Sequence, residues 1–139
     1  MNNPIKMLLV EDNPADIRLI REVLKETDNS LFVVKDGVEA LKFLNHEANY
    51  SNAPRPDIII LDLNLPRKDG REVLKEIKKN DNLKSIPVIV LTTSNSEDDI
   101  IKTYKDYANC YITKPVDFDQ FLKVIESIES FWHNAVRLS

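Results

Sequence analysis

The chain has 139 residues, of which 42% are hydrophobic and 30% charged, and this suits one globular domain with a sizeable core. No apolar run approaches the roughly 20 residues of a membrane span, and the N-terminus lacks an export signal, so we expect a cytoplasmic protein with no membrane partner. The net charge of -4 argues against a nucleic-acid partner, and the single cysteine, Cys110, excludes an internal disulfide.

Apolar runs of strand length alternate with segments of helical periodicity. The first strand ends on two acids, Glu11 and Asp12. Asn13 and Pro14 then suit a helix N-cap and first helical residue, and Asp16 lies in the first turn, where the helix dipole favours an anion. In chain order, the sequence predicts strands at 6–10, 31–34, 58–61, 87–91 and 110–113, and helices at about 14–27, 38–44, 71–79, 96–107 and from 117 past 130.

Five alternations of strand and helix predict an α/β fold with a parallel sheet, right-handed crossovers and helices on both faces. We expect a single domain over 1–139, with its core in 5–134 and a C-terminal tail at 135–139. The long polar loop at 46–56 carries no chemistry that we can assign, and His46 and His133 are expected at the surface.

Asp62 follows the apolar run 58–61, which is typical of a strand covered on both faces. Open α/β sheets bind their ligands at the C-terminal ends of such strands. From this stretch alone, a capping or turn aspartate remains equally open.

Other polar residues stand at the same predicted edge of the sheet. Three carboxylates there would favour a bound cation, and hard oxygen ligands suit Mg²⁺. A carboxylate beside the ion can attack phosphorus, while an ammonium and a hydroxyl can stabilise the transferred group. Taken singly, each residue also fits a capping, strand-end or solvated role. The residues are Glu11, Asp12, Asp62, Thr92 and Lys114.

In their order and spacing, these residues resemble the receiver domains of two-component response regulators. The resemblance runs from Lys6 through the last helix, and Asp62 precedes Thr92 by 30 residues and Lys114 by 52, as in receivers. The motifs that carry it are Glu11-Asp12, Leu61-Asp62-Leu63-Asn64-Leu65-Pro66, Asp69-Gly70, Leu91-Thr92 and Lys114-Pro115.

The resemblance implies that Asp62 is the phosphoacceptor of a protein that catalyses only its own phosphorylation and dephosphorylation. It also implies a flavodoxin-like strand order 2-1-3-4-5, an order known for receivers, and a cis Lys114–Pro115 peptide. The implied Mg²⁺ ligands are the carboxylates of Glu11, Asp12 and Asp62 and the backbone carbonyl of Asn64. Thr92 and Lys114 would contact the phosphoryl group, Tyr111 would move inward behind Thr92, and Asn64 and Ser94 would flank the path of attacking water.

Segments 62–74 and 108–117, together with Phe131-Trp132, are similar to single-domain regulators that partner phytochrome-type histidine kinases. The chain departs from many receivers at Ala108-Asn109, where no glycine precedes the alanine. We expect a cognate histidine kinase, a downstream protein that the sequence does not name, and a homodimer. Phosphorylation is expected to change the surface of the fourth helix, fifth strand and fifth helix, and apolar residues late in the last helix exceed what the sheet requires.

Three other functions share parts of this pattern. A Mg²⁺-dependent hydrolase with an aspartyl-phosphate intermediate usually has a second carboxylate two residues after the nucleophile, where this chain has Asn64. A nucleotide- or flavin-binding domain would need a glycine-rich loop, and the chain has only Gly37 and Gly70. A docking module that takes no phosphoryl group would not need the full set of acids with Thr92 and Lys114.

Overall fold

The computed structural model describes residues 5–65, 67–92, 110–114 and 116–138. The helix predicted at 96–107, Ser94, Ala108, Asn109 and Pro115 lie outside this range. The strands are β1 (Lys6–Val10), β2 (Ser30–Val34), β3 (Ile58–Asp62), β4 (Val88–Thr92) and β5 (Cys110–Thr113). The helices are α1 (Pro14–Leu24), α2 (Gly37–Leu44), the short 3₁₀-helix η1 (Ala48–Tyr50), α3 (Gly70–Lys79) and α5 (Phe118–Leu138).

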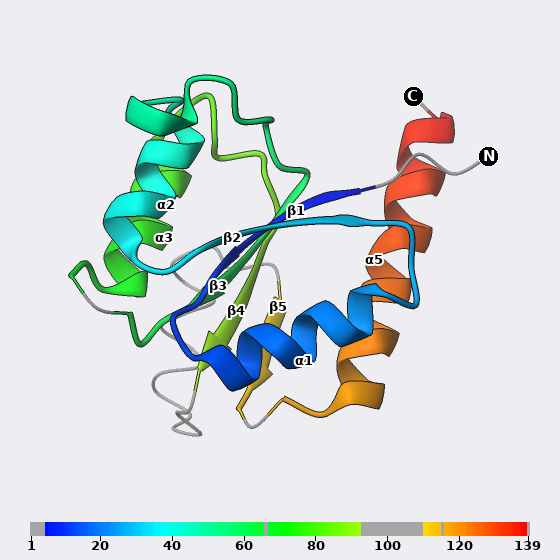
Figure 1. Cartoon of the computed structure of the whole chain (residues 1–139). Coiled ribbons are helices and arrows are strands. Elements are labelled where there is room, and N and C mark those ends of the chain that lie inside the picture. The colour runs from blue at the N-terminus through cyan, green and yellow to red at the C-terminus, as the bar shows by residue number, and fades with distance from the viewer. Residues whose placement is uncertain (1–4, 66, 93–109, 115, 139) are drawn as a thin grey trace.

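The strands form one parallel sheet in the order β2-β1-β3-β4-β5, so the predicted fold class and strand order are confirmed. Residues late in neighbouring strands are level: Val10 pairs with Leu61, and Asp62 pairs with Leu91. Because all strands run the same way, their C-terminal ends share one edge of the sheet (Figure 1).

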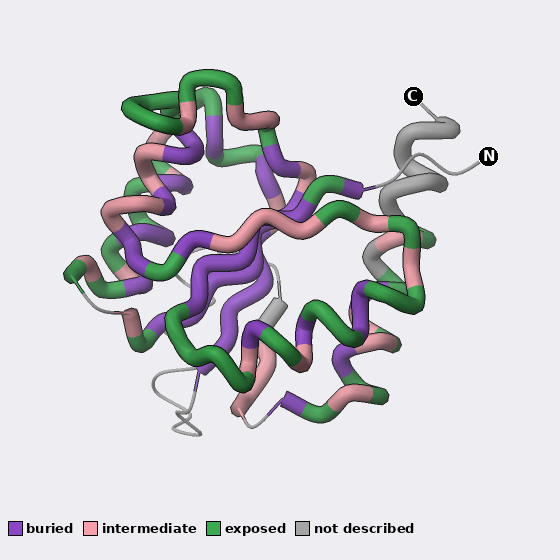
Figure 2. Tube along the Cα trace, viewed as in Figure 1, coloured by how far each residue is buried: buried purple, intermediate pink, exposed green. Residues whose placement is uncertain are grey.

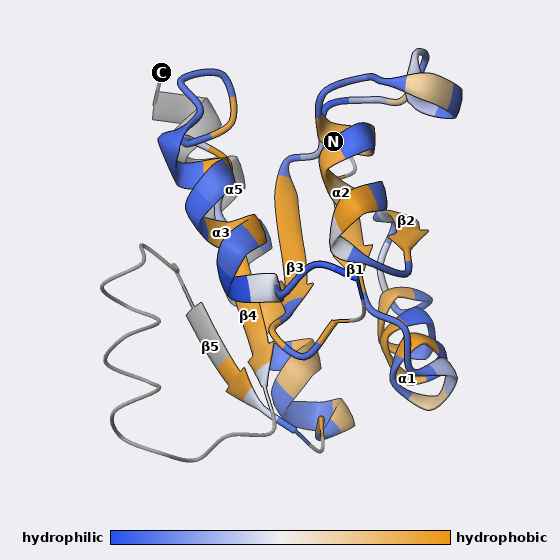
Figure 3. Ribbon diagram, turned by 90° about the vertical axis from the view of Figure 1, so that its left-hand side faces the viewer, coloured by the Kyte–Doolittle hydropathy of each residue, from blue (hydrophilic) through white to orange (hydrophobic). Residues whose placement is uncertain are grey.

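Helices cover both faces of the sheet, as predicted, with α1 and α5 on one side and α2 and α3 on the other (Figure 1). Alternate residues of the central strands enter two separate cores, so β3 and β4 are buried along their length and β1 is buried after Lys6 (Figure 2). One core contains Leu8, Ile59 and Val90, and the other contains Met7, Ile60 and Ile89. Figure 3 shows the result as hydrophobic strands between helices whose polar residues lie on the outside.

Local capping explains where the helices begin. The Asn13 side chain accepts hydrogen bonds from the backbone N–H groups of Ala15 and Asp16, which confirms the predicted cap of α1. Asp36, Asp69 and Asp117 cap α2, α3 and α5 in the same way.

Two segments differ from the sequence prediction by more than one residue, while the other described ends agree with it to within one residue. Helix α1 ends at Leu24, and Glu26 and Thr27 continue in tighter turns through hydrogen bonds to Val23 and Leu24. The loop 46–56 contains η1, which follows His46 and includes Ala48, both of which have positive φ angles. Hydrophobic periodicity carries no signal for such short turns.

A close contact fixes the start of α3 against the end of β3. A Cβ atom added to Gly70 would lie 2.3 Å from the Asp62 carbonyl oxygen and 2.6 Å from the Leu63 Cα. The Gly70 N–H also donates to the Leu63 carbonyl at 3.2 Å. Only glycine allows the helix to begin this close to the residue at the end of the central strand.

Candidate functional site

An acidic cluster lies where β1 and β3 end. One carboxylate oxygen from each of Glu11, Asp12 and Asp62 lies within 4.8 Å of the others. Glu11 and Asp62 are buried, at 0% and 2% exposure, and Asp12 is exposed. The cluster predicted from the sequence therefore forms, and it opens to solvent on the side of Asp12.

Backbone groups orient the two buried carboxylates. Glu11 Oε2 accepts the N–H groups of Asp12 and Asn13 at 3.0 and 3.3 Å. Asp62 Oδ1 accepts the N–H of Asn64 at 2.9 Å. These bonds occupy one oxygen of each carboxylate and direct the other toward the interior of the cluster.

Lys114, which follows β5, enters the cluster from the opposite side. Its ammonium nitrogen Nζ lies 2.6 Å from Glu11 Oε1 and 3.1 Å from Asp62 Oδ2. Its backbone N–H donates to the carbonyl of Thr92 at 2.7 Å, which ties the residue to the end of β4. One cation therefore bridges the two buried acids.

A fourth carboxylate also contacts Lys114. Asp16 Oδ2, from the first turn of α1, lies 2.9 Å from Nζ. Sequence reasoning placed Asp16 at the helix dipole and missed this ion pair. The sequence offered one signal for this contact, because the first turn of α1 lies at the same edge of the sheet as the acids. That signal was weak, because an acid in a first helical turn is already explained by capping or by the helix dipole.

Burial and the mutual repulsion of the acids change the ionisation of the cluster. Burial, with a smaller contribution from the neighbouring Asp62 carboxylate, raises the pKa of Glu11 to about 7, although Lys114 acts in the opposite direction. Burial alone would lower the pKa of Lys114, but its bonds to Glu11, Asp16 and Asp62 outweigh burial and raise this pKa above its usual value. Lys114 is therefore a fixed positive charge.

The donor set fits a divalent cation. Three carboxylates, of which the Asp12 carboxylate is exposed, match the oxygen ligands of Mg²⁺ or Mn²⁺, which keep several waters when few protein ligands are present. The carboxylates of Glu11, Asp12, Asp16 and Asp62 outnumber the single ammonium of Lys114, and the Asp62 carboxylate adds to burial in raising the pKa of Glu11. A cation at this position would relieve that excess.

The other predicted site residues lie around the cluster. Thr92 is buried at the end of β4, and Asn64 is exposed just beyond β3. Tyr111 lies on β5, level with Val90 of β4. Ser94 and the Lys114–Pro115 peptide lie outside the described residues.

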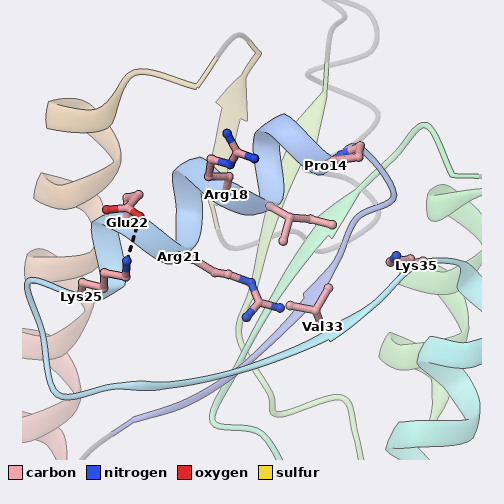
Figure 4. Close-up of a pocket in the computed structure, with 8 residues that line it drawn as sticks. Pro14, Arg18, Arg21, Glu22, Lys25, Val33 and Lys35 are labelled. Atoms are coloured by element: carbon pink, nitrogen blue, oxygen red, sulfur yellow. Dashed lines mark hydrogen bonds and ion pairs between the residues drawn. The ribbon is translucent and has the colours of Figure 1, made fainter.

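A hollow of about 480 Å³ borders the same edge along α1 and the edge strand β2 (Figure 4). Pro14, Ile17 and Val33 contribute its apolar surface. Four basic side chains and one acidic side chain, Glu22, also line the hollow. Glu22 pairs with Lys25 at 2.9 Å. The cations are Arg18, Arg21, Lys25 and Lys35.

The fold and the site define a class: a parallel α/β protein whose strand ends hold an acidic cluster and one buried lysine. The model of the response regulator receiver domain matches residues 7–126. The chain is 52% identical to the response regulator Rcp1 of Synechocystis sp. over 139 residues, which covers 99% of this chain and 95% of Rcp1. It therefore belongs to the response regulator receiver family of two-component signalling.

Solved structures agree with this assignment. The Mn²⁺-bound form of Rcp1 superposes with a TM-score of 0.82 at 53% identity, covering 93% of this chain and 94% of that one. The phosphorylated cyanobacterial phytochrome response regulator RcpA gives a TM-score of 0.84 at 51% identity, covering 96% of each chain. Among the described residues, no helix is long and apolar enough to cross a membrane.

Proposed function

We propose that Asp62 accepts a phosphoryl group from a histidine kinase and that the phosphorylated protein acts by binding a partner. The observation that carries the proposal is the position of Asp62: its Oδ2 atom lies 3.1 Å from Lys114 Nζ inside an acidic cluster that fits a divalent cation. An acceptor carboxylate needs both positive charges, because the transferred group brings further negative charge.

The chemistry of this transfer is an in-line displacement. A carboxylate oxygen of Asp62 forms a P–O bond while the P–N bond of the phosphohistidine breaks, and the electron pair of that bond stays on the imidazole nitrogen. Mg²⁺, held by Glu11, Asp12, Asp62 and the Asn64 carbonyl, would neutralise charge on the phosphoryl oxygens. Lys114 would neutralise it from the other side. The relative Rcp1 has been crystallised with Mn²⁺, which supports a divalent ion of this kind.

The output of the domain is a change of shape. The acyl phosphate adds about 1.5 to 2 negative charges and three acceptor oxygens, which Thr92 at the end of β4 can bind. Thr92 would then move toward the phosphoryl group, and Tyr111 would fill the space behind it. This would alter the surface of β5, α5 and the segment between β4 and β5, which is the surface we assign to the partner or to a second copy.

The kinase is proposed to be of the phytochrome type, because RcpA is a phytochrome response regulator at 51% identity. The cations around the hollow beside α1 suit an acidic surface on such a kinase. As part of the same proposal, the protein works in the cytoplasm and turns over no substrate other than its own phosphoryl group.

Incubation with acetyl phosphate and Mg²⁺, followed by intact-mass measurement, tests the proposal. We expect one added phosphoryl group in the wild type and none in Asp62→Asn. Addition of the group to Asp62→Asn would place the acceptor elsewhere. No addition to the wild type would leave a docking module, and continuous release of phosphate at many turnovers per protein would indicate a hydrolase.

A further inference from the structure

Asp16 joins the site through Lys114 and not through the metal cluster. Its carboxylate is 2.9 Å from Lys114 Nζ, and the two side chains are only 19% and 10% exposed. The acids whose oxygens gather within metal-binding distance are Glu11, Asp12 and Asp62, so Asp16 is outside this group. Among the site residues that the structure describes, its ion-pair partner is the Lys114 ammonium.

A helix-dipole role does not account for this geometry. An acid in the first turn of a helix interacts with the dipole while it points to solvent, and such interactions are weak. Asp16 is instead largely buried and bonded to a lysine that comes from the far end of the sheet. Loss of solvation for both groups requires a close, well-formed pair in return.

The three acids around Lys114 differ in what the reaction does to them. Asp62 becomes an acyl phosphate in the proposed function, and Glu11 would share its charge with the bound cation. Neither the phosphoryl group nor the cation acts on Asp16, whose partner is the Lys114 ammonium. Of the contacts that hold the ammonium, the one to Asp16 is therefore the one that the reaction leaves unchanged.

We propose that Asp16 is a positioning residue, an anchor that holds the Lys114 ammonium beside Asp62 before and after phosphoryl transfer. This inference rests on the proposed function of Asp62. Lysine has a long, flexible chain, and Lys114 keeps its ammonium in place only through its partners. Without the anchor, the ammonium would move toward Glu11 or solvent when Asp62 reacts, and misplacement by about 1 Å is costly for transfer.

The test compares Asp16→Asn, which removes the charge, with Asp16→Glu, which restores it. Asp119→Asn is the matched control, since Asp119 is an exposed acid in the first turn of α5. The first measurement is the rate of phosphorylation by acetyl phosphate at saturating Mg²⁺. We expect Asp16→Asn to slow it about 3- to 10-fold, Asp16→Glu to recover at least half of the loss, and Asp119→Asn to match the wild type.

The second measurement follows the lysine directly and needs no phosphorylation. The ¹⁵N-ammonium NMR signal of Lys114, assigned by its loss in Lys114→Met, reports how firmly the ammonium is held. We expect a resolved signal in the wild type, Asp16→Glu and Asp119→Asn, and a broadened or shifted one in Asp16→Asn.

An unchanged Lys114 signal in Asp16→Asn would overturn the inference, whatever the rate, because the residue would not act through Lys114. If the wild type is readily phosphorylated, an unchanged phosphorylation rate in Asp16→Asn would overturn the inference as well. A wild type that takes no phosphoryl group would instead refute the proposed function, and that result is distinct from either of these.

Discussion

Glu11 is the acid on which metal binding and pH act together. It is fully buried, and burial with the nearby Asp62 raises its pKa to about 7. A cation that binds between these carboxylates must compete with the proton on Glu11. Because the cation relieves the repulsion that the proton otherwise relieves, it is expected to stabilise the folded protein.

The residue-scale prediction concerns Mn²⁺ at pH 8, where Glu11 is ionised. At a concentration of 100 times its dissociation constant, Mn²⁺ should raise the free energy of unfolding by about 2.7 kcal/mol, and excess EDTA should remove the gain. Asp12→Asn should weaken Mn²⁺ binding at least about 10-fold, since it removes one of three carboxylates. Urea unfolding with and without Mn²⁺ measures both effects.

Asp28→Asn is the control for this experiment, because Asp28 is exposed beyond the other end of α1. It should respond to Mn²⁺ as the wild type does. Equal stabilisation of Asp12→Asn and the wild type would show that the cation binds elsewhere.

The raised pKa of Glu11 also determines whether the stability of the folded protein rises or falls with pH. In the metal-free protein, Glu11 of the folded state stays protonated up to about pH 7, whereas Glu11 of the unfolded chain loses its proton near pH 4.5. The contribution of Glu11 to the free energy of unfolding is therefore fully present below about pH 4.5 and is lost as pH rises through about 7. With Mn²⁺ present the proton is displaced, so the stabilisation by Mn²⁺ should be smaller at pH 6 than at pH 8. Unfolding curves at the two pH values measure this difference, and a larger Mn²⁺ effect at pH 6 would contradict it.

At the scale of elements, the junction of β3 and α3 holds Asp62 in place. The helix starts so close to the strand that a methyl group on Gly70 would overlap the Asp62 carbonyl. Any adjustment must move the backbone of the residue that we assign as the phosphoacceptor. The packing of α3 and the chemistry of the site are therefore coupled at one glycine.

Gly70→Ala is expected to lower the free energy of unfolding by about 1–3 kcal/mol, as overpacking does in well-packed cores, and to slow phosphorylation of Asp62 as well. Gly37→Ala is the matched control, since its Cβ would lie 2.7 Å from the Lys68 carbonyl and from Val73, away from Asp62. It should destabilise without a comparable loss of phosphorylation. Chemical unfolding and intact mass after acetyl phosphate measure the two effects, and full stability of Gly70→Ala would contradict the argument.

Helix α1 also presents two of the cations of the hollow in Figure 4, Arg18 and Arg21. If an acidic surface of the kinase meets them, Arg18→Glu with Arg21→Glu should slow transfer from a phosphorylated phytochrome-type kinase about 10-fold at low salt. Phosphorylation by acetyl phosphate should not change. Lys75→Glu, an exposed charge reversal on α3, is the control. Equal slowing with both donors would place the effect in the site and not in docking.

The elements show what the sequence was able to predict. Strands β3 and β4 are apolar up to their last residues, Asp62 and Thr92, so the position of these two polar residues at the strand ends followed from the pattern. The ion pair of Asp16 with Lys114 did not follow, because it joins residues 98 positions apart that come together only at the shared C-terminal edge of the folded sheet. Local reasoning had already given Asp16 a sufficient role at the helix dipole. The strand order likewise came from the family resemblance, since alternation alone does not fix it.

At the scale of the whole molecule, α5 extends farther than the match to the family does. The helix runs from Phe118 to Leu138, while the receiver match ends at residue 126. Asn29 is tied to it by a hydrogen bond to Glu129 at 3.0 Å, so the helix is fixed to the domain up to that point. Phe131 and Trp132 follow along the helix, in the part that we propose meets a second copy of the protein.

Sedimentation velocity tests dimerisation through this end of α5. We expect the wild type to form dimers at micromolar concentration, more strongly with beryllofluoride and Mg²⁺, which mimic the acyl phosphate. Trp132→Glu should shift the protein toward monomers, because a charge would be buried without a partner, whereas Ser127→Glu, at an exposed position of the same helix, should not.

Thr92→Ala should bind beryllofluoride yet lose the increase in dimerisation, since Asp62 stays and the hydroxyl that responds to the beryllofluoride is gone. A monomer in both states would remove the dimer from the proposed output and leave a different protein as the partner of the phosphorylated surface.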